Sequence, residues 1–179
     1  MGAIENFTPE KLIVGVLSTR LDRHSELEAE LVSAFGEMEA TYGPYPFTFT
    51  DYYEPEMGPD IQRMFYVCKE LVSPGSLSTI KRTTDTIEEL FTEEGNRKIN
   101  LDPGILSRDR FILATTKDRG HRIPLQDGIY GEVTLIYMNK GFQSLAWTYT
   151  DFKTEEYRNL LAVIRKSYLK QLREDSVKQ

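Results

Sequence analysis

Residues 100–137, NLDPGILSRDRFILATTKDRGHRIPLQDGIYGEVTLIY, contain two strong strand patterns, a Pro-Gly pair and most of the unusual polar residues of the chain. The apolar run at 110–117 (RFILATTK) predicts a strand, and residues 121–137 predict one or two more. A turn is expected within the latter segment, at 126–128 (QDG). The stretch therefore predicts neighbouring strands that carry polar side chains, and we expect the functional site here.

The residues before this stretch predict strands and a helix in alternation. A continuous apolar run at 11–18 (KLIVGVLS) is typical of a central strand that is covered on both faces. Apolar residues at helical spacing predict a helix over 25–39. Aromatic and polar residues alternate at 46–53 (PFTFTDYY), and another apolar run lies within 61–72. We expect these last two segments to form strands that pair as a hairpin.

A second helix and a C-terminal helix complete the expected elements. Ser73 followed by Pro74 is a typical helix start, and Gly95 stands where that helix is expected to end. Residues 142–147 predict a further strand, and a long amphipathic helix begins near Thr154.

The order of these elements is β-α-β-β-α-β, followed by extra strands and a helix. It favours an α+β fold with a ferredoxin-like βαββαβ core, a mixed sheet and helices over one face. An irregular α+β layer structure is the alternative. We expect a lead-in at 1–10, a single globular domain at 11–174 and a tail at 175–179, because a chain of 179 residues can bury one core.

Composition and charge exclude several classes of protein. The net charge of −6 argues against sequence-independent binding of nucleic acid, which needs clustered Lys and Arg. No run approaches the roughly 20 apolar residues of a membrane helix, and the first ten residues lack the pattern of a signal peptide. The single cysteine, Cys68, has no partner for an internal disulfide. We therefore expect a cytoplasmic protein that contacts no membrane.

Common catalytic signatures are missing from the sequence. It has no Walker loop, GxGxxG, GxSxG, HExxH or CxxC motif, and so the local patterns of NTPases, dinucleotide enzymes, α/β-hydrolases, zincins and thiol redox proteins are not found. Any chemistry must therefore come from polar residues that the fold brings together.

Asp102 is the first of these candidates. It precedes Pro103 and Gly104, so its side chain can cap the turn expected there. A carboxylate held rigidly by such a turn is also suited to bind a metal ion or to take a proton. Thr115, Thr116 and Lys117 end a predicted strand, where two hydroxyls and an ammonium are suited to contact phosphate oxygens. A solvated strand end is the alternative reading.

The second group of candidates lies on the following strand. His121 is suited to act as a base or a ligand, and Arg122 offers a planar fork for a carboxylate or phosphate. Within one strand these two side chains would face opposite sides, unless the strand begins after them. Glu132 interrupts an apolar strand, and if buried it needs a partner such as Arg122, Lys117 or a bound cation. An exposed strand face is the alternative.

Several longer segments resemble one known family. The motifs are PFTFTDYYEPEMG, INLDPGIL, FILATTKDRGHRIPL, DGIYGEVTLIY and WTYTDF, in this order. They are similar to the bacterial family catalogued as domain of unknown function 4416, and the resemblance extends from about Lys11 to Tyr168. It implies a stand-alone cytoplasmic protein of bacterial type. It implies no activity and no catalytic residues.

Two functions are consistent with these observations. The first is binding of, or catalysis on, a small anionic and phosphate-bearing ligand, with a divalent metal as an optional cofactor. His121, Asp102 and Glu132 would be the catalytic groups, Asp102 and Glu132 the metal ligands, and Lys117, Arg122, Thr115 and Thr116 the ligand-binding residues. The second is a non-catalytic interaction module or homo-oligomer, in which the same residues are turn caps and structural ion pairs.

Overall fold

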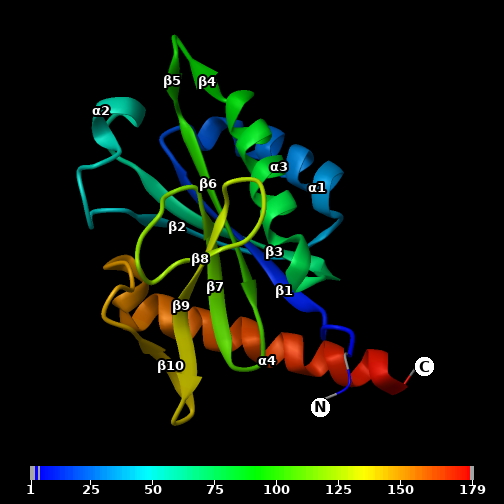
Figure 1. Cartoon of the computed structure of the whole chain (residues 1–179). Coiled ribbons are helices and arrows are strands. Elements are labelled where there is room, and N and C mark those ends of the chain that lie inside the picture. Colours follow the sequence, from blue (N-terminus) through cyan, green and yellow to red (C-terminus); the bar gives the residue numbers. More distant parts are fainter. Residues whose placement is uncertain (1–2, 4, 178–179) are drawn as a thin grey trace.

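The computed structural model describes residue 3 and residues 5–177, and its centre is an eight-stranded sheet (Figure 1). Seven strands follow the order β10-β9-β7-β6-β1-β3-β2, and β8 pairs with β9. The strands are β1 (Glu10–Ser18), β2 (Met38–Pro46), β3 (Gln62–Val72), β6 (Ile99–Leu106), β7 (Arg110–Thr115), β8 (Ile123–Pro124), β9 (Tyr130–Met138) and β10 (Gly141–Ser144).

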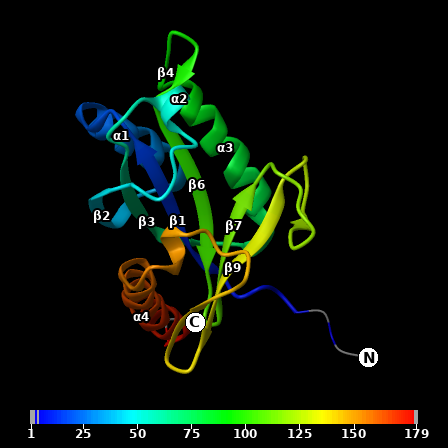
Figure 2. The same cartoon turned by 90° about the vertical axis from the view of Figure 1, so that its left-hand side faces the viewer.

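Helices cover both faces of this sheet. α1 (His24–Phe35) and α3 (Leu77–Glu89) lie on one face, and α4 (Glu155–Val177) lies on the other (Figure 2). The short α2 (Glu54–Met57) follows β2, and β4 (Thr92–Glu93) with β5 (Asn96–Arg97) forms a separate hairpin. Single 3-10 turns lie at Leu21–Arg23, Pro74–Ser76 and Asp151–Lys153. We expected helices over one face only, and the long apolar stripe of α4 accounts for the third layer.

The alternation of β1 side chains explains the two cores. Leu12, Val14 and Val16 pack toward α1 and α3, whereas Ile13 packs with the α4 side. Every residue of β1 is buried, which is why its sequence is a continuous apolar run instead of an alternating one. No helix in the described part of the chain is long and apolar enough to cross a membrane.

The fold is α+β, as expected, but the sheet is not mixed. Each strand ladder in the described residues is antiparallel. The connections β1-α1-β2 and β3-α3-β6 each skip one strand position. A strand of opposite direction therefore fills each gap, and strands that run the same way are never neighbours.

The first helix is shorter than predicted and the second strand lies earlier. α1 ends at Phe35 because Gly36, with φ of 82°, turns the chain out of the helix. β2 then uses residues 38–46. The aromatic segment 47–53, predicted to be a strand, instead lies outside the sheet. Its alternating rings, including Phe47, pack into a small apolar cluster beside α2.

The turn predicted at Asp102 is wrong, because this residue lies within β6 opposite Gly15 of β1. The second helix ends at Glu89, whereas Gly95 lies between β4 and β5. At the chain ends, β1 already includes Glu10 and α4 includes residues 175–177. The other residues of the expected lead-in and tail lie partly outside the described range.

Candidate functional site

A cavity opens where β6 and β7 separate. The two strands pair only from Gly104–Leu113 to Leu106–Phe111, and beyond this short ladder they diverge (Figure 2). Gly104 is required at the join, because a Cβ there would lie 2.6 Å from the Phe111 ring. The cavity of about 700 Å3 lies in the opening and is lined by α3, β6, β7, the 47–53 segment and residues 149–152.

Where β6 has no neighbouring strand, side chains of α3 form hydrogen bonds with its backbone. Lys81 Nζ donates to the Leu101 carbonyl oxygen at 2.9 Å, and the Leu101 N–H donates to Glu88 Oε1 at 2.6 Å. Because alternate residues of a strand direct their backbone groups to the same side, Pro103 faces this opening too. Its missing N–H therefore costs no ladder bond, which explains a proline inside a central strand.

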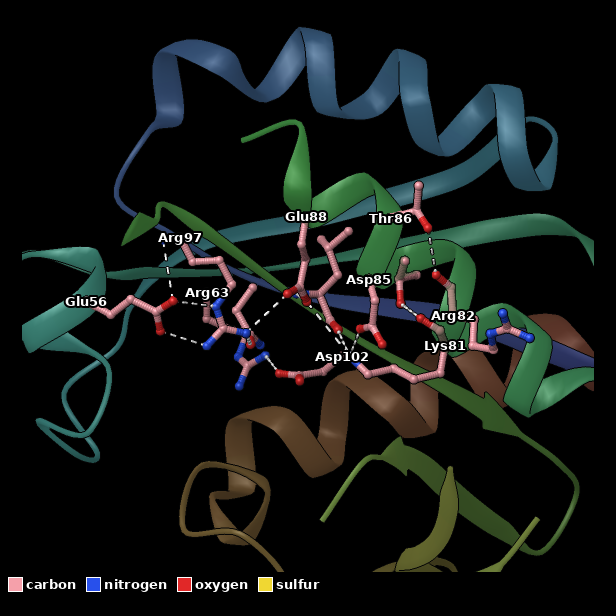
Figure 3. Close-up of polar contacts among 12 residues, drawn as sticks. Glu56, Arg63, Lys81, Arg82, Asp85, Thr86, Glu88, Arg97 and Asp102 are labelled. Carbon is pink, nitrogen blue, oxygen red and sulfur yellow. Dashed lines mark hydrogen bonds and ion pairs between the residues drawn. The ribbon is translucent and has the colours of Figure 1, made fainter. Parts of the chain in front are cut away.

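Lys81 and Glu88 belong to a buried ion-pair network. Lys81 Nζ lies 2.7 Å from Asp85 and 3.8 Å from Glu88 (Figure 3). Burial alone would lower the pKa of Lys81, but Glu88, Asp102 and Asp85 outweigh it and the pKa is raised. Burial raises the pKa of Glu88, against the opposing effect of Lys81 and Arg97.

Arg97 connects this network to the outer wall. Its guanidinium binds both carboxylate oxygens of Glu56, with Nε–Oε1 at 3.0 Å and Nη2–Oε2 at 2.8 Å. Arg97 Nη1 also donates to Glu88 at 3.1 Å and to Asn100 Oδ1 at 2.9 Å. These bonds raise the pKa of Arg97 and lower that of Glu56. The β4–β5 hairpin is thereby fixed to α2 and α3 (Figure 3).

Arg63 of β3 forms a second buried network. Its guanidinium is 2.9 Å from Asp151 and 3.3 Å from Asp102, and it lies over the Phe47 ring at 5.2 Å. Burial would lower the pKa of Arg63, but the two carboxylates outweigh it and raise the pKa. Burial raises the pKa of Asp151 although Arg63 opposes this. Asp102 therefore serves as a partner of Arg63 and not as a turn cap.

Glu132 is buried and has the partners that a buried carboxylate needs. His121 Nε2 lies 2.9 Å and Arg122 Nε 2.8 Å from Glu132 Oε2. Both residues precede β8, so strand alternation does not separate them. The His121 ring also stacks on Trp147 at 5.0 Å, and Arg122 donates to the Tyr149 hydroxyl at 2.7 Å.

The structure brings most of the predicted site residues together. Five of them line the cavity, namely Asp102, Thr115, Thr116, Lys117 and Glu132. His121 and Arg122 are not among the lining residues and instead hold Glu132. Sequence reasoning thus identified one wall of the cavity and the support behind it.

The opposite wall was missed. It consists of charged and amide side chains from distant segments: Arg63, Lys81, Asp85, Glu88, Arg97, Asn100 and Asp151. Lys81 and Glu88 gave a signal that could have been used, because both fall on the apolar face of α3 beside Ile80 and Ile87. A charged residue on a buried helix face needs a partner. Asp151 and Asn100 gave no local signal, because only the tertiary fold shows their burial.

The predicted metal ligands are bonded to arginine side chains. Asp102 accepts from Arg63, and Glu132 accepts from Arg122. Within residues 3 and 5–177, no group of three or more His, Cys, Asp or Glu side chains is arranged to hold a metal ion. A metal role for Asp102 and Glu132 stays a prediction.

Comparison with known proteins identifies the family. The family described as Domain of unknown function (DUF4416) matches residues 8–168. The chain belongs to this family. No curated protein and no solved structure matches the chain. The family assignment agrees with the motifs in the sequence, and the family description names no activity, so the function has to be argued from the cavity.

Proposed function

We propose that the cavity binds a small anionic, phosphate-bearing ligand. The observation that carries this proposal is one lysine of the cavity wall that has no ion-pair partner among the described residues. Four basic and five acidic side chains line it: Arg63, Lys81, Arg97 and Lys117, and Asp85, Glu88, Asp102, Glu132 and Asp151. Among the residues described, every one of these except Lys117 forms an ion pair with an opposite charge. Lys117 is therefore the cation available to an incoming anion.

The surroundings of Lys117 support a phosphoryl group. Thr115 and Thr116 line the cavity next to it and supply hydroxyls that donate to phosphate oxygens. The Lys117 ammonium lies 3.1 Å from the Tyr52 hydroxyl and 4.6 Å from the centre of that ring. Tyr52 comes from the 47–53 segment, so two walls of the cavity meet at this ammonium. Tyr52 is 64% exposed and Lys117 is exposed as well, so a ligand would bind here at the mouth of the cavity.

Thermal-shift measurements with phosphate-bearing compounds test the proposal. A ligand at about 100 times its dissociation constant adds about 2.7 kcal/mol, which raises the melting temperature of a chain of this size by roughly 5–11 °C. In Lys117→Ala we expect the affinity to fall by about 10- to 100-fold, because one hydrogen bond to a charged group is lost. Lys166→Ala is the matched control, since Lys166 is an exposed lysine on α4 outside the cavity.

Two results would refute the proposal. One is the absence of any shift above about 1 °C across phosphomonoesters, nucleotides and inorganic phosphate. The other is a shift that Lys117→Ala and Lys166→Ala reduce equally, because binding would then not involve the cavity cation.

Catalysis is an extension of this proposal. In this extension His121 positions the Glu132 carboxylate through its Nε2 bond, because the His121 side chain does not line the cavity. Asp102 and Glu132 are the acid/base or metal-binding candidates in the same extension. Adding divalent cations to the thermal-shift screen, with a chelator as control, tests the metal: a cation-dependent shift lost in Glu132→Gln would support it.

An interaction module is the second candidate function. Ile123 and Leu125, on and beside the short strand β8, are 62% and 43% exposed, and the nearby Trp147 is 40% exposed. Exposed apolar side chains on an edge strand favour association with another chain. Sedimentation velocity of the wild type and of Ile123→Ser tests this function. A dimer lost in the variant would support it, and a monomer at all concentrations would refute self-association.

We also propose a ferredoxin-like core and a cytoplasmic bacterial protein. Support for the core comes from the strand order β6-β1-β3-β2 with the crossovers β1-α1-β2 and β3-α3-β6. Support for the cytoplasm comes from the single buried cysteine, Cys68.

A further inference from the structure

We infer that the ligand of the cavity is hydroxylated as well as phosphorylated, as a sugar phosphate or polyol phosphate is. This inference rests on the proposed function and names the chemical class of its ligand. It comes from three lining side chains that are almost fully buried: Arg63, Asn100 and Glu132 are 3%, 5% and 1% exposed. Each has one polar atom without a hydrogen-bond partner among the described residues, namely Arg63 Nε, Asn100 Nδ2 and Glu132 Oε1.

The hydrogen bonds that each of these side chains forms show which of its atoms is left unpaired. Arg97 can only donate, so the amide oxygen of Asn100 faces it and the Nδ2 group is the one left over. Glu132 Oε2 is taken by His121 and Arg122, which leaves Oε1. Arg63 uses its two terminal nitrogens for Asp102 and Asp151, which leaves Nε–H. These three lining residues therefore hold two donor nitrogens and one acceptor oxygen that have no partner, and each of these atoms is itself buried in the cavity wall.

This combination discriminates between classes of ligand group. A phosphate dianion or a carboxylate accepts hydrogen bonds only, so it satisfies Arg63 and Asn100 but is repelled by the Glu132 carboxylate. An ammonium group donates only, so it satisfies Glu132 and leaves the other two unpaired. A hydroxyl both donates and accepts, and neighbouring hydroxyls therefore match all three atoms.

The orientation of the ligand follows from the same donors and acceptors. Its phosphate belongs at Lys117, Thr115 and Thr116, where donors without an opposing carboxylate are available. Its hydroxyls belong at Glu132, Asn100 and Arg63. Apolar lining residues such as Leu113 and Phe49 are suited to contact the carbon skeleton.

Matched pairs of compounds test the inference on the full chain by titration calorimetry. D-ribose 5-phosphate is compared with n-pentyl phosphate, and glycerol 3-phosphate with n-propyl phosphate, so each pair shares its phosphate and chain length. We expect the hydroxylated member of at least one pair to bind at least about 10-fold more tightly, because a site built to hydrogen-bond a hydroxyl rejects the analogue that lacks it.

Two variants locate the preference. Glu132→Gln and Asn100→Leu should each reduce the ratio of the two affinities by about 10-fold, because the hydroxylated compound loses a hydrogen bond that the alkyl phosphate does not form. Near-UV circular dichroism shows whether each variant is folded. If Glu132→Gln does not fold, Asn100→Leu and the wild-type ratio still decide.

The outcomes separate the inference from the proposal beneath it. Equal binding of both members of each pair would overturn the hydroxyl inference and leave phosphate binding intact. A wild-type preference that both folded variants retain would also overturn it. Binding of none of the phosphorylated compounds would overturn the proposed function, and the inference with it.

Discussion

Replacing Lys81 by methionine tests the claim that α3 completes the open edge of β6. The substitution keeps an unbranched apolar stem of similar length and removes the ammonium. It thereby takes away the donor to the Leu101 carbonyl and the cation beside Asp85 and Glu88. Lys81→Met creates little empty volume, so the change in stability reports on the polar contacts.

The magnitude follows from what is left unpaired. A buried carbonyl oxygen without its donor costs about 1–3 kcal/mol. Breaking a buried ion pair from one side costs about 3–5 kcal/mol in total. Glu88 keeps its bonds to Arg97 and to the Leu101 N–H. We therefore expect Lys81→Met to lower the free energy of unfolding by about 3 kcal/mol at pH 7, the lower end of that range.

The loss should depend on pH with a defined sign. Burial raises the pKa of Glu88, so the folded state binds this proton more tightly than the unfolded state does, and acidification through the folded pKa removes the cost of the buried charge. Without Lys81 that cost is larger, and the deficit of the variant should shrink as the pH falls from 7 to 4. The pKa of Lys81 is also raised. Its contribution is complete below the unfolded pKa and is lost as the pH rises through the folded pKa.

Urea unfolding at pH 4 and pH 7 measures the expected change in the deficit. Arg82→Met is the matched control on the same helix, because Arg82 pairs with Asp127 at the surface and exposed pairs contribute about 0–1 kcal/mol. A loss below about 1 kcal/mol for Lys81→Met, or one as large at pH 4 as at pH 7, would refute the reasoning.

Two further predictions concern the other ion pairs of the cavity. Asp151→Asn should lower the free energy of unfolding by about 2–4 kcal/mol and Asp102→Asn by about 1–2 kcal/mol, because Asp151 is the closer and more deeply buried partner of Arg63. Urea unfolding at pH 7 measures both losses. A larger loss for Asp102→Asn than for Asp151→Asn would contradict the assignment. Glu56→Gln should cost about 0.5–1 kcal/mol at pH 7. The bond to Arg97 lowers the pKa of Glu56, so this contribution is present above the unfolded pKa and is lost as the pH falls through the folded pKa. A cost that stays constant from pH 7 to pH 3 would show that the charge of Glu56 is not involved.

The elements that sequence patterns predicted well are those whose signal is local. β1 and β7 are runs of apolar residues, and α3 and α4 have a clear apolar stripe, so each could be placed without knowing its neighbours. A strand was wrongly predicted at residues 47–53, because aromatic and polar side chains alternate there as they do in a strand. They alternate here to fill a cluster beside α2, and the ring packing that distinguishes the two cases is tertiary.

The residues of the candidate site also fall into two groups, those with a local signal in the sequence and those without one. Thr115, Lys117 and Glu132 lie on or beside β7 and β9, which pair directly, so one stretch of sequence contained that wall. Arg63 and Asp151 are 88 residues apart in sequence and meet only in the folded chain. The strand β6 was not predicted, because a Pro-Gly pair usually marks a turn. Here Pro103 lies where β6 has no strand partner on one side, and Gly104 begins the ladder with β7.

Because the β6–β7 ladder is short, the residues that join the two halves of the sheet are mostly different from those that line the cavity. Cohesion between the two halves of the sheet depends on a three-pair join, where the ring of Phe111 leaves no room for a side chain on Gly104. In the proposed function, most ligand contacts would come from residues beyond that join. If the cavity binds a ligand as proposed, mutations of its lining residues beyond the join can change the specificity while the residues that hold the two halves of the sheet together stay the same.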